Sequence, residues 1–152
     1  SLHDAYFGQG YLVARDRLFQ IDIDHRRDMG RMAEAFGDAF VAADKAARLF
    51  HYRGDIDAEL ADLPPGVLEC AEGYVAGVNA RIAEVEADPA QMPLEYGILG
   101  INPMRWDVRD LVRARGIGEV VDLVRIGAFL DWAEANGDTG AKPQLRAALE
   151  GK

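Results

Sequence analysis

The chain has 152 residues, of which 49% are hydrophobic, so it is about the size of one ordinary domain and can bury a core. Its 17 Lys and Arg against 26 Asp and Glu give a formal net charge of −9, which argues against nucleic acid as a partner because no general basic surface can neutralise phosphates. No apolar run approaches the roughly 18 to 20 residues of a membrane span, and the N-terminus lacks the layout of a secretion signal. We therefore expect a chain that is soluble or already processed.

Two nearly continuous helices are expected at the start of the chain. Residues 4–15 read as a short helix in which Gly8 and Gly10 lower the helix propensity but allow another backbone to approach closely. From Leu18 to Phe36, apolar residues recur at steps of three and four, which predicts one face of a second helix. Asp16 is its expected N-cap and Gly37 its expected end.

The middle of the chain contains the clearest helical pattern. Residues 40–49 are rich in Ala and read as a helix, and residues 53–57 as a polar connection. Pro64 and Pro65 then open a long helix that ends near Asp88, since proline suits the first helical turn. The expected buried face of this helix is Val67, Ala71, Tyr74, Val78, Ile82 and Val85.

The C-terminal part of the chain is also predicted to be mainly helical. Residues 90–104 contain two prolines and two glycines and read as a compact loop. Asp107 starts a long helical pattern that runs to Gly137, and residues 144–150 form a short terminal helix. No composition break marks a linker, so residues 1–152 are predicted to be one piece. Several helices have apolar residues on more than one side, as expected if another chain covers them.

One cluster of potential metal ligands lies in the first helical region: Asp22, Asp24, His25 and Asp28. His25 and Asp28 share a helix face, but Asp24 points about 100° away from His25 and no second His lies nearby in the sequence. The alternative is a helix edge in which His25 packs beside Met29, with the carboxylates solvated or paired to the adjacent arginines.

Only three side chains could serve as an oxygen or sulfur nucleophile, because the sequence has a single Ser, a single Thr and a single Cys. Cys70 lies at helical spacing among apolar residues, which is typical of a small packed residue; the alternative is a thiolate with His25 or His51 as its base. Ser1 could use its own α-amino group as a base. Thr139 lies in a loop without an evident base.

Three segments resemble the penicillin acylase family of N-terminal-nucleophile hydrolases. Residues 10–37, GYLVARDRLFQIDIDHRRDMGRMAEAFG, are similar to a long pattern of the family's α-chains. EGYVAGVNARI at residues 72–82 and PLEYGILGINPMRWDVRD at residues 93–110 resemble two further family segments in the same order. The resemblance implies that this mainly α chain is the α-subunit of a heterodimer with the α+β, four-layer αββα architecture of that family.

The resemblance also implies where the chemistry lies. Family members are precursors that cut themselves into an α-chain and a larger β-chain, and the first residue of the β-chain, usually Ser, is the nucleophile. This chain would then hold no catalytic residue and would not be an independent catalytic domain. Ser1 would belong to the interior of the α-chain sequence, and a periplasmic or secreted location is implied.

Site residues follow from the same resemblance. The acyl pocket is formed partly by positions that match Glu119, Asp122 and Leu123. Relatives tend to carry other residue types at these positions. If the acidic side chains of Glu119 and Asp122 face the cavity, they favour an acyl group with a cationic or strongly polar feature. The alternative is that both side chains point to solvent. No cofactor is required. A structural calcium ion found in relatives would align near Ile126 or Phe129, and neither side chain can ligate a hard cation.

Substrates within the family include amides of β-lactam side chains, acyl-homoserine lactones and lipopeptide acyl chains. The residue patterns alone favour a different function, a non-enzymatic helical binding module, which should be stable and monomeric by itself. The acylase interpretation instead predicts a helical shell that is unstable without its β-chain.

Overall fold

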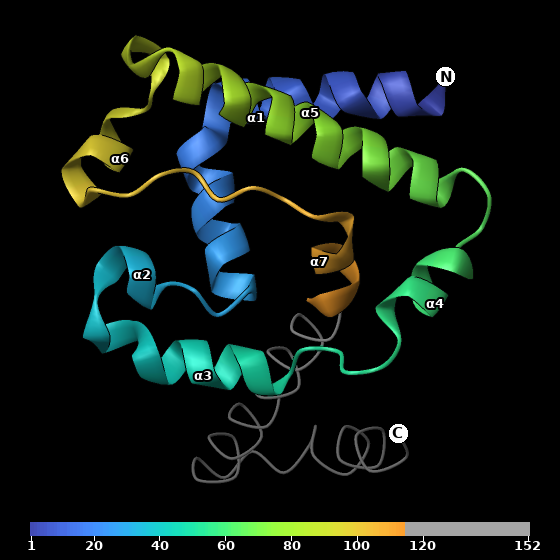
Figure 1. Ribbon diagram of the computed structural model, residues 1–152, viewed down its shortest axis with the longest axis horizontal. Helices are drawn as coiled ribbons and strands as arrows, with labels where there is room; N and C mark the ends of the chain where they lie inside the picture. Colours follow the sequence, from blue (N-terminus) through green and yellow to red (C-terminus); the bar gives the residue numbers. More distant parts are fainter. Residues whose placement is uncertain (115–152) are drawn as a thin grey trace, which may run out of the picture. The chain divides into compact units, whose positions relative to one another are not determined.

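The computed structural model describes residues 1–114, which lie within one compact unit of the chain, Ser1–Arg115. This part contains seven α-helices, which are labelled in Figure 1. They are α1 (Leu2–Asp28), α2 (Ala33–Phe36), α3 (Val41–Leu49), α4 (Ile56–Ala61), α5 (Val67–Ala87), α6 (Leu94–Leu99) and α7 (Val108–Arg113), with 3-10 turns at Asp38–Phe40 and Pro89–Gln91. Residues 1–114 contain no strand, which confirms the mainly helical class for them. The helices predicted beyond residue 114 lie outside the described residues.

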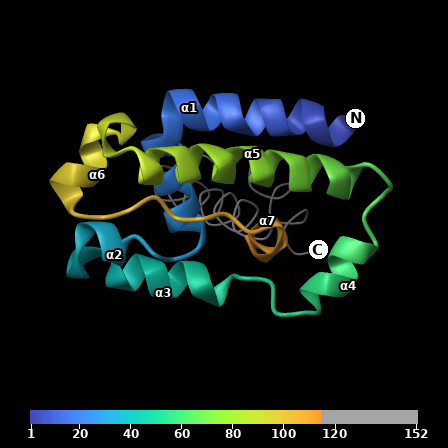
Figure 2. The same ribbon diagram turned by 45° about the horizontal axis from the view of Figure 1, so that its top comes forward.

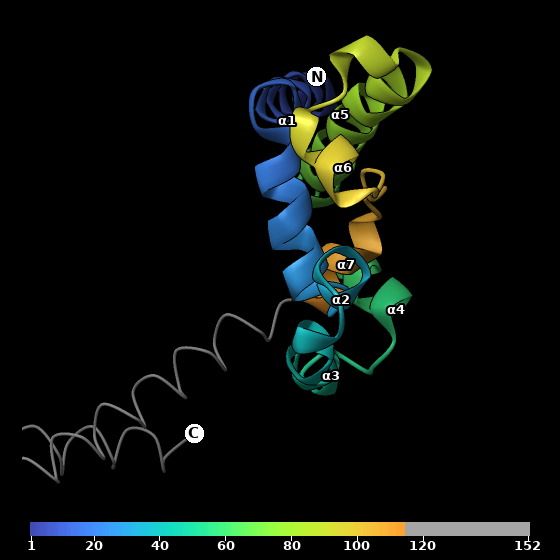
Figure 3. The same ribbon diagram turned by 90° about the vertical axis from the view of Figure 1, so that its left-hand side faces the viewer.

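The first half of α1 packs along α5, and the two helices run in the same direction (Figures 1 and 2). The backbone at Arg17 leaves the helical region, with φ −141° and ψ 31°, and bends α1 one residue after the predicted N-cap Asp16. The second half of α1 then turns away from α5 toward α2 and α3 (Figure 3). The prediction of two nearly continuous helices is confirmed.

Glycines allow the close approach of α1 and α5. A Cβ atom added at Gly10 would lie 2.2 Å from the Tyr74 carbonyl oxygen, and one at Gly77 would lie 2.1 Å from the Phe7 carbonyl oxygen. The same construction at Gly8 meets nothing within 4 Å. The predicted role in close packing is therefore right for Gly10 and wrong for Gly8.

The expected helix from Leu18 to Phe36 is wrong in one respect, because the chain leaves the helix after Asp28 and re-enters it at Ala33. Gly30 adopts the left-handed conformation, with φ +63°, which suits glycine because it lacks a Cβ atom. The side chain of Asp44 accepts hydrogen bonds from the backbone N–H groups of Met32 and Ala33, both at 2.8 Å, and so stabilises the new start.

The long helix α5 ends where predicted, but it begins at Val67, so the proline pair precedes the helix and does not form its first turn. Gly66 precedes it in the left-handed conformation, one residue after the proline pair, and Asp88 is its C-cap. Of the expected buried face, Val78, Ile82 and Val85 are buried, whereas Val67 at the start of the helix is exposed.

The predicted loop at residues 90–104 also contains a helix, α6, which the prolines and glycines of this stretch obscured. Pro93 precedes it as N-cap, and Gly100 ends it in the left-handed conformation. Tyr96 from α6 enters the main core, where its ring meets Phe19 edge to face at 5.4 Å. The buried members of this core are Ala14, Leu18, Val78, Ile82, Val85 and Tyr96. No helix within residues 1–114 is both long and apolar enough to cross a membrane.

Candidate functional site

The residues that the resemblance assigns to binding lie outside the described residues: Glu119, Asp122 and Leu123 for the acyl pocket, and Ile126 and Phe129 near the calcium position. The described structure ends with α7 and Ala114. It shows how the chain is held just before these positions.

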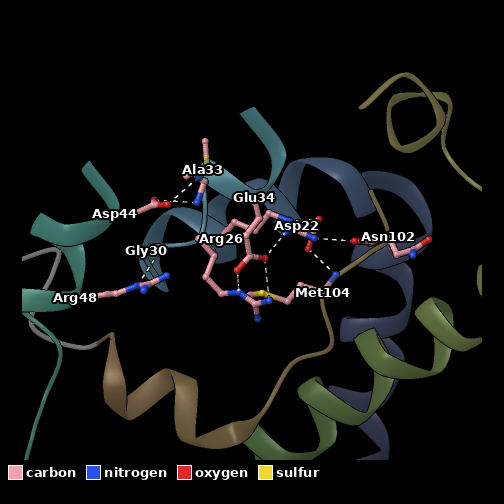
Figure 4. A network of polar contacts seen from close by, with 11 residues as sticks. Asp22, Arg26, Gly30, Ala33, Glu34, Asp44, Arg48, Asn102 and Met104 are labelled. Carbon is pink, nitrogen blue, oxygen red and sulfur yellow. Dashed lines mark hydrogen bonds and ion pairs between the residues drawn. The ribbon is translucent and has the colours of Figure 1, made fainter. Parts of the chain in front are cut away.

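A buried guanidinium connects the second half of α1 to the segment that leads into α7 (Figure 4). Arg26 donates from Nε to Asp22 at 2.9 Å and from Nη2 to the Asn102 carbonyl oxygen at 2.7 Å. Asp22 also accepts from the backbone N–H of Met104 at 2.9 Å, and Glu34 lies 3.4 Å from Arg26 Nη1. Because the two buried charges are paired and hydrogen-bonded, losing either partner should cost about 3–5 kcal/mol.

A side chain from α5 holds the same segment from another direction. Asn79 donates from Nδ2 to the Trp106 carbonyl oxygen at 2.8 Å, and its Oδ1 accepts from the Trp106 backbone N–H at 2.9 Å. Arg105 donates to the Asn79 carbonyl oxygen at 3.1 Å. The three sequence segments that carry the family resemblance therefore meet at residues 102–106.

The start of α7 is held by a capping box and by a contact with α1. Asp107 is the N-cap, and Asp110 accepts from the Asp107 backbone N–H at 3.3 Å. The second role of Asp110 is a contact between its Oδ2 and Nε2 of the buried His25, at 3.1 Å. Burial raises the pKa of Asp110, but the hydrogen bond and positive charge of His25, with the Asp107 backbone N–H and Arg113, hold it below its ordinary value.

A pocket of about 390 Å³ lies where α1, Trp106 and α7 meet. Its apolar wall consists of Ile21, Met29, Trp106, Leu111 and Ala114, and its polar groups are Asp24, His25, Asp28 and Asp110. The ring of His25 packs against that of Trp106, with centroids 4.5 Å apart. The pocket thus combines an apolar wall with several carboxylates.

The proposed metal ligands are mostly engaged with other partners. Asp22 belongs to the Arg26 network, Asp24 pairs with Arg27, and His25 pairs with Asp110. No group of three or more potential ligands forms a metal site among residues 1–114. The structure favours the helix-edge interpretation, although the prediction missed the contact of His25 with Asp110.

Within the described residues, the contacts of the candidate nucleophiles Ser1 and Cys70 are those of structural residues. Ser1 caps α1, since its Oγ accepts from the Asp4 backbone N–H at 3.1 Å. Cys70 is a partly buried residue of α5. The imidazole of His51 contacts the Asp28 carbonyl oxygen at 2.7 Å, and within residues 1–114 no hydrogen bond joins Cys70 to a histidine. Thr139 lies outside the described residues.

The sequence is similar to known acylases over most of its length. The family described as penicillin amidase matches residues 1–121. Penicillin G acylase of Escherichia coli is 36% identical over 107 residues, which are 70% of this chain and 13% of that protein. An acyl-homoserine lactone acylase QuiP of Pseudomonas fluorescens is 29% identical over 110 residues, which are 72% of this chain and 13% of that protein.

The fold is similar to that of a solved acylase. A thermostable penicillin G acylase from Alcaligenes faecalis matches with a TM-score of 0.71 and 29% identity, over 98% of this chain and 80% of that chain. The matches to the curated relatives, by contrast, cover only 13% of their length. The described helices therefore correspond to one part of a longer protein in those relatives.

Proposed function

This chain belongs to the penicillin amidase family, and we propose that it is the α-subunit of an amidohydrolase that cleaves a linear amide in an N-acyl compound. The observation that carries the proposal is the match over residues 1–121, with 36% identity to an Escherichia coli penicillin G acylase. The acyl side chain of a β-lactam or a related N-acyl compound is the proposed substrate.

The reaction would use a nucleophile from a partner β-chain made from the same precursor. The hydroxyl of its N-terminal Ser attacks the acyl carbonyl, its own α-amine takes the proton through a water, and the amine product leaves with a proton. Backbone and Asn donors stabilise the oxyanion, and water then hydrolyses the acyl-enzyme. One relative, from a Pseudomonas species, is named a proenzyme, which supports a processed precursor.

Exposed apolar side chains support a partner that covers this chain. Leu94 and Ile98 lie one turn apart on α6 and are 75% and 72% exposed, and Leu49 at the end of α3 is 67% exposed. Large aliphatic side chains on a free surface are costly when they are contiguous, and they typically mark an interface. We assign this coverage to the β-chain. From the family resemblance alone, we also propose a periplasmic or secreted location.

We further propose that Glu119, Asp122 and Leu123 contribute to the acyl pocket. The side chains of Arg26 and Asn79 fix the backbone just before α7, and Glu119, Asp122 and Leu123 follow α7 in the sequence. Because Glu119 and Asp122 are acidic, the preferred acyl group would carry a cationic or strongly polar feature.

A second candidate activity within the family is hydrolysis of acyl-homoserine lactones, favoured by the 29% identity to QuiP. A lipopeptide acyl chain is a further substrate of the same chemical type. Comparing a cationic, an aryl and a long aliphatic acyl group on one leaving amine would rank these possibilities.

The first experiment is denaturing mass spectrometry with N-terminal sequencing of the protein purified from expression of its complete gene. We expect two chains in equal amount, the larger one beginning with Ser, Thr or Cys. A single folded, monodisperse chain of this length would contradict the proposal and would favour the helical binding module.

Activity is then measured as release of the amine from N-acyl substrates. Cys70→Ala should leave the rate unchanged, because the nucleophile is on the β-chain, whereas loss of activity would favour a cysteine enzyme. Glu119→Gln and Asp122→Asn should shift the preference from cationic toward neutral acyl groups. An unchanged preference would show that these side chains do not line the pocket.

A further inference from the structure

The pocket between α1, Trp106 and α7 has the size and wall of a small-molecule site. Its volume of about 390 Å³ lies within the range of ligand pockets, roughly 300 to 1,000 Å³. Ile21, Met29 and Leu111 supply aliphatic surface, and Trp106 supplies an aromatic ring. An apolar body the size of one ring fits such a wall.

One carboxylate of the pocket has no hydrogen-bonded partner within residues 1–114, although Arg27, His25 and His51 act on it electrostatically. Asp24 pairs with Arg27, and Asp110 pairs with His25. Asp28 lines the same pocket, is partly buried, and its carboxylate forms no hydrogen bond or ion pair with the rest of residues 1–114. A partly buried carboxylate without a partner is unfavourable, so a cation at this position would be stabilised.

We propose that this pocket binds a small organic ammonium ion, a primary amine on an apolar ring or chain, with the ammonium at Asp28 and the apolar body against Ile21, Trp106 and Leu111. An anionic ligand would meet three carboxylates, and a neutral one would leave Asp28 unpaired. The net charge of −9 favours the approach of cations in general.

The site has a defined pH dependence. Burial raises the pKa of Asp28 above its ordinary value, and the charge of Asp24 raises it further, whereas Arg27, His25 and His51 oppose this shift. A bound ammonium favours the ionised carboxylate and lowers this pKa again. Affinity for the amine should therefore fall as the pH decreases through the pKa of Asp28, while the amine itself stays protonated.

The test uses isothermal titration of the complete protein with 2-phenylethylamine, 2-phenylethanol and 3-phenylpropanoate, which share one apolar body. The amine should bind at least about tenfold more tightly than the alcohol, and the carboxylate most weakly, because a hydrogen bond to a charged group contributes more than one between neutral groups. This comparison uses only the wild-type protein, so the result cannot be affected by a variant that fails to fold.

Two variants then locate the binding. Asp28→Asn should weaken amine binding at least about tenfold and remove the advantage over the alcohol. Asp38→Asn makes the same change of charge at an exposed residue outside the pocket and should have no effect.

Three results would overturn the proposal. They are equal affinity for amine and alcohol, unchanged binding by Asp28→Asn, and no binding to the wild-type protein, as expected if other parts of the protein fill the pocket. Binding is measured without turnover, so the outcome is independent of whether the protein hydrolyses amides.

Discussion

The contact between α1 and α5 provides a sharp test because two glycines have opposite surroundings. In Gly77→Ala, the new Cβ atom would lie 2.1 Å from the Phe7 carbonyl oxygen and 2.7 Å from the Tyr11 amide nitrogen. Ordinary contacts of this type begin at 3.4 Å, so the helices must separate by about 1 Å, which forfeits much of the dispersion energy along their contact. Overpacking of this kind typically costs about 1–3 kcal/mol, and occasionally more.

Helix propensity acts in the other direction. Ala is favoured over Gly inside a helix by about 1 kcal/mol, so propensity alone predicts that Gly77→Ala stabilises the protein. We expect a net destabilisation of up to about 2 kcal/mol, because the steric cost exceeds the gain in propensity. Gly8→Ala is the matched control: it lies in α1, its Cβ would meet nothing within 4 Å, and it should stabilise by up to about 1 kcal/mol.

The assay is urea unfolding of the complete protein followed by circular dichroism, with both variants compared to wild type. The midpoint should fall for Gly77→Ala and rise slightly for Gly8→Ala. Equal shifts of the same sign, or a midpoint for Gly77→Ala at or above that of wild type, would refute the close-packing argument.

Three further predictions concern carboxylates that are buried or partly buried. Asp44→Ala leaves two backbone N–H groups unpaired and should cost about 2–4 kcal/mol, and Asp44→Asn, which keeps one acceptor, about half as much; urea unfolding measures both. Because the pKa of Asp110 is lowered in the folded state, its contribution to stability is present above the unfolded pKa of about 3.9 and is lost as the pH falls through the folded pKa. Asp110→Asn should thus lower the thermal midpoint at neutral pH and flatten its decline in acid; an unchanged acid profile would contradict this linkage. The effect on stability has the opposite sign for Asp28, because burial raises its pKa in the folded state. Asp28→Asn should therefore leave the thermal midpoint at pH 7 unchanged or slightly raised. A clear drop would mean that the carboxylate has a partner in the complete protein.

The structure also gives a physical reason for residues that carry the family resemblance. Gly77 lies where the backbone of α1 passes closest to α5, and Asn79 binds both backbone groups of Trp106. Arg26 reaches the carbonyl oxygen of Asn102. These residues join segments that lie far apart in the sequence, so their role is to position the chain ahead of α7.

Patterns within one segment were enough to predict several helices. The period of Val78, Ile82 and Val85 identifies α5 and its buried face, and Asp107 marks the start of α7, because helix periodicity and capping depend on residues three or four positions apart. The break after Asp28 was not predictable in this way. It depends on Asp44, which reaches back from α3 to cap the backbone of α2.

The pairing of charges likewise depended on the tertiary structure. The sequence places Asp22, His25 and Arg26 on one helix and is consistent with either a metal site or ion pairs. Asn102, Met104 and Asp110 decide between these possibilities, because the folded chain brings them against α1 from more than 70 positions away. The helices follow from short-range interactions along the chain, which the sequence shows directly. The packing of distant segments instead determines which partners the buried charges find, and it forms the pocket in which Asp28 has no hydrogen-bonded partner.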